Sequence, residues 1–127
     1  MKKILIIDND PVFASTVSSL LKHQNFAVSV AENGKDAIKN IAGTQFDLII
    51  TDALMTYTTG LELVSKVRRN VSSRYTPVIV ISSISNEQNI SGWFREGANA
   101  YLKKPLDLPV LLTEIRHLML DTQHVAA

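Results

Sequence analysis

The sequence contains no cysteine, which excludes disulfide bonds, cysteine-ligated zinc and thiol chemistry. It also lacks an excess of charge of one sign. Thirteen Lys and Arg residues face 12 Asp and Glu residues, so electrostatics favours neither nucleic acid nor an anionic membrane as a partner. The first apolar run, residues 4–7, ends at Asp8 and is too short for a signal peptide or a membrane span. We therefore expect a soluble, cytoplasmic domain that is long enough, at 127 residues, to bury a core.

Five short apolar runs alternate with longer amphipathic stretches along the whole chain. Continuous runs rich in Ile and Val are typical of strands buried on both faces, whereas the second run alternates around Ser29 and indicates an edge strand. The predicted strands cover residues 4–7, 27–31, 48–50, 78–81 and 100–102.

The stretches between these runs have helical periodicity. Asp10 followed by Pro11 predicts a helix start with Asp10 as N-cap, and Gly97 is typical of the residue after a helix end. The predicted helices cover residues 11–21, 34–42, 60–69, 86–96 and 107–120. Strands joined through helices run parallel, and right-handed crossovers place helices on both faces of the sheet. The pattern predicts a single α/β domain, a doubly wound parallel five-stranded (βα)5 fold over residues 1–120, followed by a short tail at 121–127.

Polar side chains follow the first, third, fourth and fifth predicted strands. Because ligands bind at the carboxyl ends of strands in an open parallel sheet, these positions are candidates for a common site. They are Asp8, Asn9 and Asp10 after the first strand, Thr51 and Asp52 after the third, Ser82 and Ser83 after the fourth, and Lys103, Lys104 and Pro105 after the fifth. Carboxylates suit a hard divalent cation, and a lysine with a nearby hydroxyl suits a phosphoryl group.

Each of these residues also has an ordinary structural explanation when it is taken alone. An Asp after a strand is commonly a turn residue or a helix cap, and Asp10 is best explained as a cap. Ser82 alone indicates a loop hydroxyl, and Lys104 alone a solvated charge. Turn residues have no reason to occupy matching ends of four strands, which favours a joint anion and metal site. Neither a P-loop nor a dinucleotide-binding glycine motif is present as an alternative phosphate site.

The aromatic pair Trp93-Phe94 indicates a contact surface. Adjacent residues of one helix cannot both face the core, so we expect one of the two rings to be exposed.

The ordered set of motifs resembles the receiver domain of two-component response regulators over essentially the whole chain. The matching segments are residues 4–11 (ILIIDNDP), 47–52 (DLIITD), Met55 with Gly60, 77–83 (PVIVISS), Gly97-Ala98 and 101–105 (YLKKP). The resemblance implies a flavodoxin-like sheet with strand order 2-1-3-4-5. It also implies a phosphoryl group accepted from a histidine kinase, a phosphotransfer protein or a small phosphodonor, with Mg²⁺ in the site.

The resemblance also assigns roles to individual residues. Asp52 is the expected phosphoacceptor, Lys104 the phosphate-binding lysine, Ser82 the switch hydroxyl and Tyr101 the switch aromatic. The expected metal ligands are Asp8, Asn9, Asp52 and the backbone carbonyl of Leu54. The Lys104-Pro105 peptide bond is expected to be cis.

Three positions depart from the family pattern. Asn9 stands where the second acidic residue is usual, so an amide oxygen without charge replaces a carboxylate and Mg²⁺ binding should be weak. Thr56 replaces the usual proline after Met55, which removes a backbone restraint from the loop. Ser82 replaces threonine, which is a mild change.

Two hypotheses from different classes follow. The first is a phosphoacceptor that catalyses its own phosphorylation, is not a turnover enzyme, and switches an interaction surface. The second is a pseudo-receiver, a protein-interaction module that works without phosphorylation. An output domain or effector, or a second copy in a homodimer, is expected on the face made by residues 86–96, 100–102 and 107–120, with no direct contact to nucleic acid or membrane.

Overall fold

The computed structural model describes residues 1–54, 60–83 and 90–126, and beyond Met119 the backbone alone. Met55, Thr56 and the expected start of a helix at residue 86 lie outside the described residues. The strands are β1 (Lys3–Ile7), β2 (Ala27–Ala31), β3 (Leu48–Asp52), β4 (Val78–Ser82) and β5 (Ala100–Lys103). The helices are α1 (Pro11–His23), α2 (Gly34–Gly43), α3 (Gly60–Arg69), α4 (Ile90–Glu96) and α5 (Leu108–Ala126).

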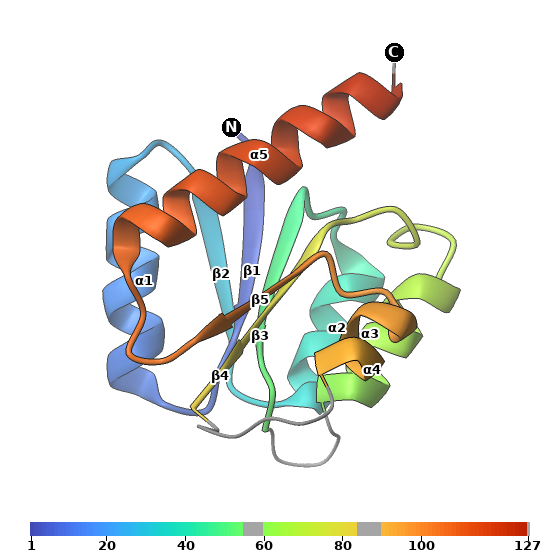
Figure 1. The fold of residues 1–127 in the computed structure, drawn as a ribbon, viewed down its shortest axis with the longest axis horizontal. Coiled ribbons are helices and arrows are strands. Elements are labelled where there is room, and N and C mark those ends of the chain that lie inside the picture. The colour runs from blue at the N-terminus through green and yellow to red at the C-terminus, as the bar shows by residue number, and fades with distance from the viewer. Residues whose placement is uncertain (55–59, 84–89, 127) are drawn as a thin grey trace.

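The five strands form one parallel sheet in the order β2-β1-β3-β4-β5, which confirms the expected flavodoxin-like topology. Helices α1 and α5 cover one face of the sheet, and α2, α3 and α4 cover the other (Figure 1). The second strand lies at an edge, as its alternating pattern predicted. No helix among the described residues is long and apolar enough to cross a membrane.

Two hydrophobic layers, one on each face of the sheet, hold the fold together. Alternate strand residues face opposite sides, so Leu5 and Ile49 pack toward α2, α3 and α4, whereas Ile4 and Ile50 pack toward α1 and α5. All four side chains are at most 1% exposed, and burying a side chain of this size stabilises the fold by about 1.5–3 kcal/mol. The three central strands are therefore a rigid platform, and their carboxyl ends carry the candidate site.

Local signals at the helix ends work as the sequence predicted, with one exception. The Asp10 carboxylate accepts hydrogen bonds from the backbone N–H groups of Val12 (3.0 Å) and Phe13 (3.3 Å), so Asp10 is the N-cap of α1. Gly97 follows α4 with a φ of +119°, a conformation that favours glycine. The expected end of the last helix at Leu120 is wrong, because α5 continues to Ala126. Residues 121–126 contain no proline or glycine that would end it, and the division of the chain at residue 120 stays a prediction.

Candidate functional site

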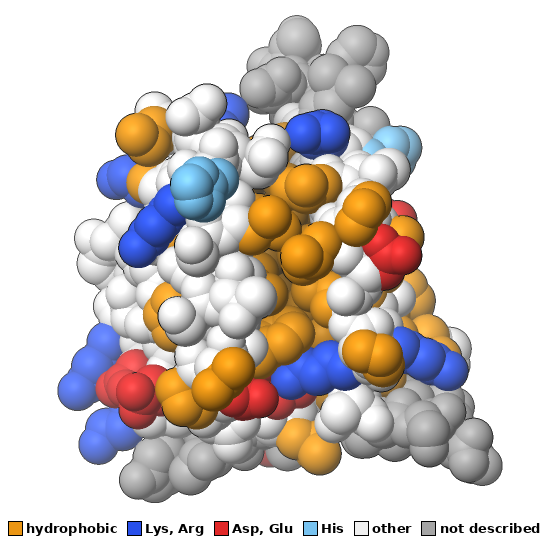
Figure 2. Space-filling view, turned by 90° about the vertical axis from the view of Figure 1, so that its left-hand side faces the viewer, with side chains coloured by type: hydrophobic (Ala, Val, Ile, Leu, Met, Phe, Trp, Pro, Cys, Tyr) orange, Lys and Arg blue, Asp and Glu red, His pale blue; other side chains and the backbone are white. Residues whose placement is uncertain are grey.

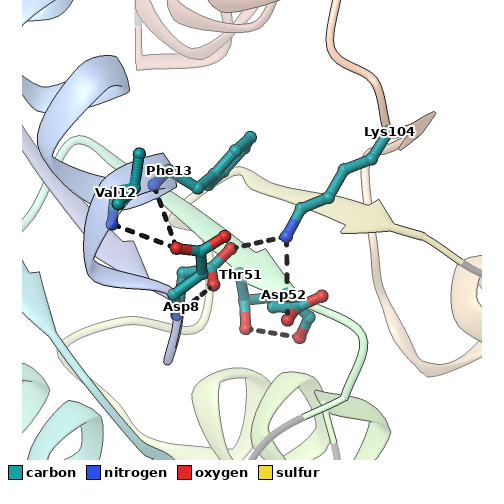
Figure 3. Close-up of polar contacts among 7 residues, drawn as sticks. Asp8, Val12, Phe13, Thr51, Asp52 and Lys104 are labelled. Atoms are coloured by element: carbon teal, nitrogen blue, oxygen red, sulfur yellow. Dashed lines mark hydrogen bonds and ion pairs between the residues drawn. The ribbon is translucent and has the colours of Figure 1, made fainter.

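Three side chains from three different strand ends meet at the carboxyl edge of the sheet. Asp8 follows β1, Asp52 ends β3 and Lys104 follows β5. The Lys104 Nζ lies 3.0 Å from Asp8 Oδ2 and 3.9 Å from Asp52 Oδ2. Figure 3 shows the lysine reaching across the edge toward both carboxylates. The structure thus brings together three of the residues that the sequence predicted for one site.

The register of the central strands places the two carboxylates side by side. Ile7 of β1 pairs with Thr51 of β3, so Asp8 and Asp52 are the next positions on two neighbouring strands. Both are buried, with exposed fractions of 2% and 8%. One oxygen of Asp8 accepts a 2.8 Å hydrogen bond from the backbone N–H of Asp10, which leaves its other oxygen for Lys104. The sheet therefore holds two carboxylates in a fixed position before any ligand arrives.

The electrostatic balance at this edge is unfavourable to the carboxylate form of Asp52. Burial raises the pKa of Asp52 above its usual range, and the negative charge of Asp8 raises it further. The charge of Lys104 and the backbone N–H groups of Leu54 and Ala53 lower the pKa but do not cancel these effects. Because one lysine faces two carboxylates, a cation bound here would relieve their repulsion.

The donor chemistry at this edge fits Mg²⁺. The carboxylates of Asp8 and Asp52 and the backbone carbonyl of Leu54 are hard oxygen donors, the type that Mg²⁺ prefers. Asn9 follows Asp8 at the exposed rim and offers an amide oxygen. Within the described part of the chain there is no group of three or more His, Cys, Asp or Glu side chains that could hold a metal ion. The site therefore has two carboxylates where the family pattern has three acidic side chains.

Ser82 lies between Asp52 and Lys104 at the same edge. It is the last residue of β4, it is 1% exposed, and β4 lies between β3 and β5 in the sheet. Its backbone carbonyl accepts a 2.8 Å hydrogen bond from the N–H of Lys104, which ties the lysine backbone to the end of β4. The Lys104-Pro105 bond is cis, as expected.

Tyr101 and the aromatic pair lie around the α4 side of the sheet. Tyr101 is half-buried and packs against the hydrophobic layer under α2, α3 and α4, and its buried hydroxyl has no hydrogen-bond partner among the described residues. Trp93 is 6% exposed whereas Phe94 is 46% exposed, which confirms that only one ring of the pair faces the core.

Two contacts at the site were not predicted from the sequence. A Cβ atom added to Gly60 would lie 2.8 Å from the backbone oxygen of Asp52 and 2.8 Å from the ring of Trp93, so the first residue of α3 is packed tightly between the end of β3 and the Trp93 side chain of α4. The Lys104 Nζ also lies 4.2 Å from the centre of the Phe13 ring. In the sequence Phe13 is only one of several apolar positions of a helix, and nothing local identifies its partner.

Comparisons with known proteins show the family to which this chain belongs. The model of the family described as the response regulator receiver domain matches residues 4–116. The response regulator ArlR of Staphylococcus saprophyticus is 30% identical over 119 residues, which cover 94% of this chain and 53% of that protein. The chain thus spans about half the length of the curated relatives it matches.

Solved structures share the fold. The chemotaxis response regulator CheY4 of Vibrio cholerae has a TM-score of 0.87 at 27% identity, over 93% of this chain and 98% of that one. The receiver domain of the sensor histidine kinase PA1611 of Pseudomonas aeruginosa, which has a magnesium ion in its active-site cleft, has a TM-score of 0.85 at 19% identity over 93% and 97% of the two chains. This chain belongs to the receiver domains of response regulators, the phosphorelay signalling proteins of two-component systems.

Proposed function

We propose that this receiver domain is a phosphorylation switch whose acceptor is Asp52. The observation that carries the proposal is the Lys104 ammonium placed 3.0 Å from Asp8 and 3.9 Å from Asp52 at converging strand ends. Receiver domains interact with histidine kinases and with output domains. The phosphodonor of this chain is then a phosphohistidine of a histidine kinase or of a phosphotransfer protein, or a small phosphodonor, in the cytoplasm.

The proposed reaction transfers a phosphoryl group to the Asp52 carboxylate. A bond forms between the Asp52 oxygen and phosphorus while the phosphorus–nitrogen bond of the donor breaks, and the departing imidazole nitrogen keeps the electron pair and takes a proton from water. The ammonium of Lys104 offsets the charge of the phosphoryl oxygens as they approach the carboxylate. No covalent bond to Lys104 is made, so its contribution is position and charge.

The residues that would hold Mg²⁺ in this reaction are Asp8, Asp52, Asn9 through its amide oxygen and Leu54 through its backbone carbonyl. When bound, it offsets the negative charge of the carboxylates and of the phosphoryl oxygens. Asn9 contributes no charge, so we expect weaker Mg²⁺ binding than a carboxylate at this position would give.

The switch connects Asp52 to the face made by α4, β5 and α5. Ser82 lies at the end of the strand next to Asp52, and Tyr101 lies on β5 with a buried hydroxyl that no described residue binds. Movement of the Ser82 hydroxyl toward an aspartyl phosphate changes the space open to Tyr101. The exposed ring of Phe94 and the exposed Lys103 give this face an apolar and a basic contact for an output domain, an effector or a second copy in a homodimer.

Two observations favour a second candidate, the pseudo-receiver that acts without phosphorylation. Asn9 removes one charge from the metal site, and Lys104 lies closer to Asp8 than to the acceptor Asp52. If phosphorylation is inefficient, the same fold still presents the α4, β5 and α5 face to a partner.

Incorporation of labelled phosphate from phosphoramidate in excess Mg²⁺ separates the two candidates. We expect wild type to be labelled, Asp52→Asn to take up no label, and Asp10→Asn to be labelled as wild type is. Asp10 is the matched control because it is an acidic residue at the same edge whose carboxylate caps α1, and asparagine keeps that cap. Labelling of Asp52→Asn would move the acceptor elsewhere, and the absence of labelling in folded wild type would favour the pseudo-receiver.

A further inference from the structure

The position of the Lys104 ammonium depends on three contacts in the described part of the chain. Two are with the carboxylates of Asp8 and Asp52, and the third is with the ring of Phe13, whose centre lies 4.2 Å from Nζ. At this distance the ring attracts the cation through its negatively charged face. Figure 3 shows the three partners around the end of the lysine, with Phe13 coming from the first turn of α1.

We propose that Phe13 is a positioning residue for Lys104, and this inference rests on the proposed phosphorylation of Asp52. In that reaction both carboxylates acquire a new partner, since Asp8 becomes a metal ligand and an oxygen of Asp52 becomes bonded to phosphorus. The ring of Phe13 cannot be protonated, phosphorylated or bound to Mg²⁺. It is therefore the one contact of the three that holds the ammonium before and after phosphoryl transfer.

The chain holds the Phe13 ring in place through the start of α1. The Asp10 carboxylate accepts a hydrogen bond from the backbone N–H of Phe13, which fixes the backbone of the first turn of the helix. The ring packs against the hydrophobic layer that includes Val17 and is half-buried there. A lysine has a flexible four-carbon stem and many conformations in water. A fixed ring beside its ammonium group reduces the number of these conformations and favours those close to Asp52.

Phe13 and Lys104 both line an open groove between α1 and the segment that follows Lys104. This groove has a volume of about 400 Å³ and is lined by Val12, Phe13, Thr16, Pro105 and Leu106, among others. Figure 2 shows the apolar strip between α1 and α5, with basic and acidic side chains near one end. Because Phe13 lines this open groove, we expect a hydroxyl added to its ring to be tolerated, which makes a conservative replacement possible.

Three variants separate attraction by the ring from simple packing. Phe13→Leu keeps an apolar side chain and removes the ring face, whereas Phe13→Tyr keeps the face. Val12→Ala is the matched control, because Val12 is 73% exposed and lines the same groove without contacting Lys104 in the described contacts. Should Phe13→Leu fail to fold, Phe13→Met removes the ring with a more adaptable side chain.

The first measurement is the NMR shift of the ε-methylene protons of Lys104, assigned through their loss in Lys104→Met. We expect an upfield ring-current shift in wild type, Phe13→Tyr and Val12→Ala, and its loss in Phe13→Leu. This measurement requires no phosphorylation. A shift that is unchanged in Phe13→Leu would overturn the inference even if Asp52 is phosphorylated normally.

The second measurement is the rate of labelling by phosphoramidate at saturating Mg²⁺. We expect a fall of about three- to tenfold in Phe13→Leu, recovery in Phe13→Tyr and no change in Val12→Ala. An equal fall in Phe13→Tyr, or no fall in Phe13→Leu, would overturn the positioning role. If folded wild type takes up no label, the proposed function fails, and the contact on which the inference depends is then decided by the ring-current shift alone.

Discussion

Arg68 gives a sharp test of which hydrogen bonds hold the helices of this fold to the sheet. This residue lies in the last turn of α3, and its guanidinium donates to the backbone oxygens of Thr76 (2.6 Å) and Gly97 (2.8 Å) and to the side-chain oxygen of Asn99 (2.7 Å). Burial lowers the pKa of Arg68, and no ion pair with a carboxylate is formed among the described residues. One side chain thus connects α3 to the residues before β4 and before β5. These residues lie at the amino ends of the strands, whereas Asp52 lies at the carboxyl end of β3.

Replacement of Arg68 by Met keeps much of the apolar stem and removes every one of these hydrogen bonds. Hydrogen bonds to a charged group contribute about 1.5–3 kcal/mol each, but the acceptors at this partly exposed position regain water when the guanidinium is removed. The cost of burying the cation is also removed. We therefore expect the free energy of unfolding to fall by about 3 kcal/mol, which for a domain of this length is a fall in Tm of about 10 °C.

Urea denaturation followed by circular dichroism and by the fluorescence of Trp93 measures the change. Arg69→Met is the matched control, because Arg69 is the adjacent basic residue of the same helix and is exposed. We expect a change of at most about 0.5 kcal/mol for the control. Phosphate labelling of folded Arg68→Met should match that of wild type, because Asp8, Asp52 and Lys104 lie at the carboxyl ends of the strands, away from Arg68.

Two results would refute this reasoning. If Arg68→Met and Arg69→Met lose the same stability, the hydrogen bonds of Arg68 contribute nothing beyond a surface charge. If Arg68→Met keeps its stability and loses labelling, Arg68 acts on the site and is not a structural link.

Three further predictions follow from the site. Burial and a neighbouring carboxylate raise the pKa of Asp52, so the stability that Asp52 contributes is complete below the unfolded pKa of about 3.9 and is lost as pH rises through the folded pKa. Asp52→Asn should therefore have a higher Tm than wild type at pH 7 and the same Tm at pH 3. A lower Tm of the variant at pH 7 would contradict this prediction. Asn9→Asp should bind Mg²⁺ about tenfold more tightly in a calorimetric titration, and equal or weaker binding would count against Asn9 as a ligand. Gly60→Ala should lower the free energy of unfolding by about 1–3 kcal/mol and shift the fluorescence emission of Trp93. Gly43→Ala is the control and should not be destabilised, because a Cβ added there meets nothing within 4 Å. Equal stability of the two variants would exclude the close packing at Gly60.

The fold and the position of the site follow from local patterns in the sequence. The alternation of apolar runs and helical periods determines a parallel sheet, and a parallel sheet brings the carboxyl ends of its strands to one edge. Asp8, Asp52 and Lys104 could therefore be predicted to meet although up to 96 residues separate them in the chain. Asp10 and Gly97 could be predicted because a cap and a helix-ending glycine depend only on their neighbours.

The contacts that the sequence did not reveal are pairs whose partners have no local signal. The spacing that places Phe13 on the apolar face of α1 is the same whether or not a lysine lies above the ring. Arg68 in the last turn of α3 has the position of any basic residue favoured by the helix dipole, and its acceptors lie up to 31 residues away. The same limit applies to Gly60 and Trp93, which meet only after α3 and α4 pack side by side.

Buried charge is paired differently at the amino ends and at the carboxyl ends of the strands. At the amino ends of the strands, neutral oxygens accept hydrogen bonds from the Arg68 cation, an arrangement that we expect to stabilise the fold alone. At the edge with Asp52, one lysine faces two buried carboxylates, so a negative charge is left without a full partner and the pKa of Asp52 rises. A buried charge of this kind lowers stability, and the fold retains it where a cation and a phosphoryl group would use it. The incomplete pairing of two carboxylates with one lysine therefore supports the proposal that the carboxyl ends of the strands form the functional site.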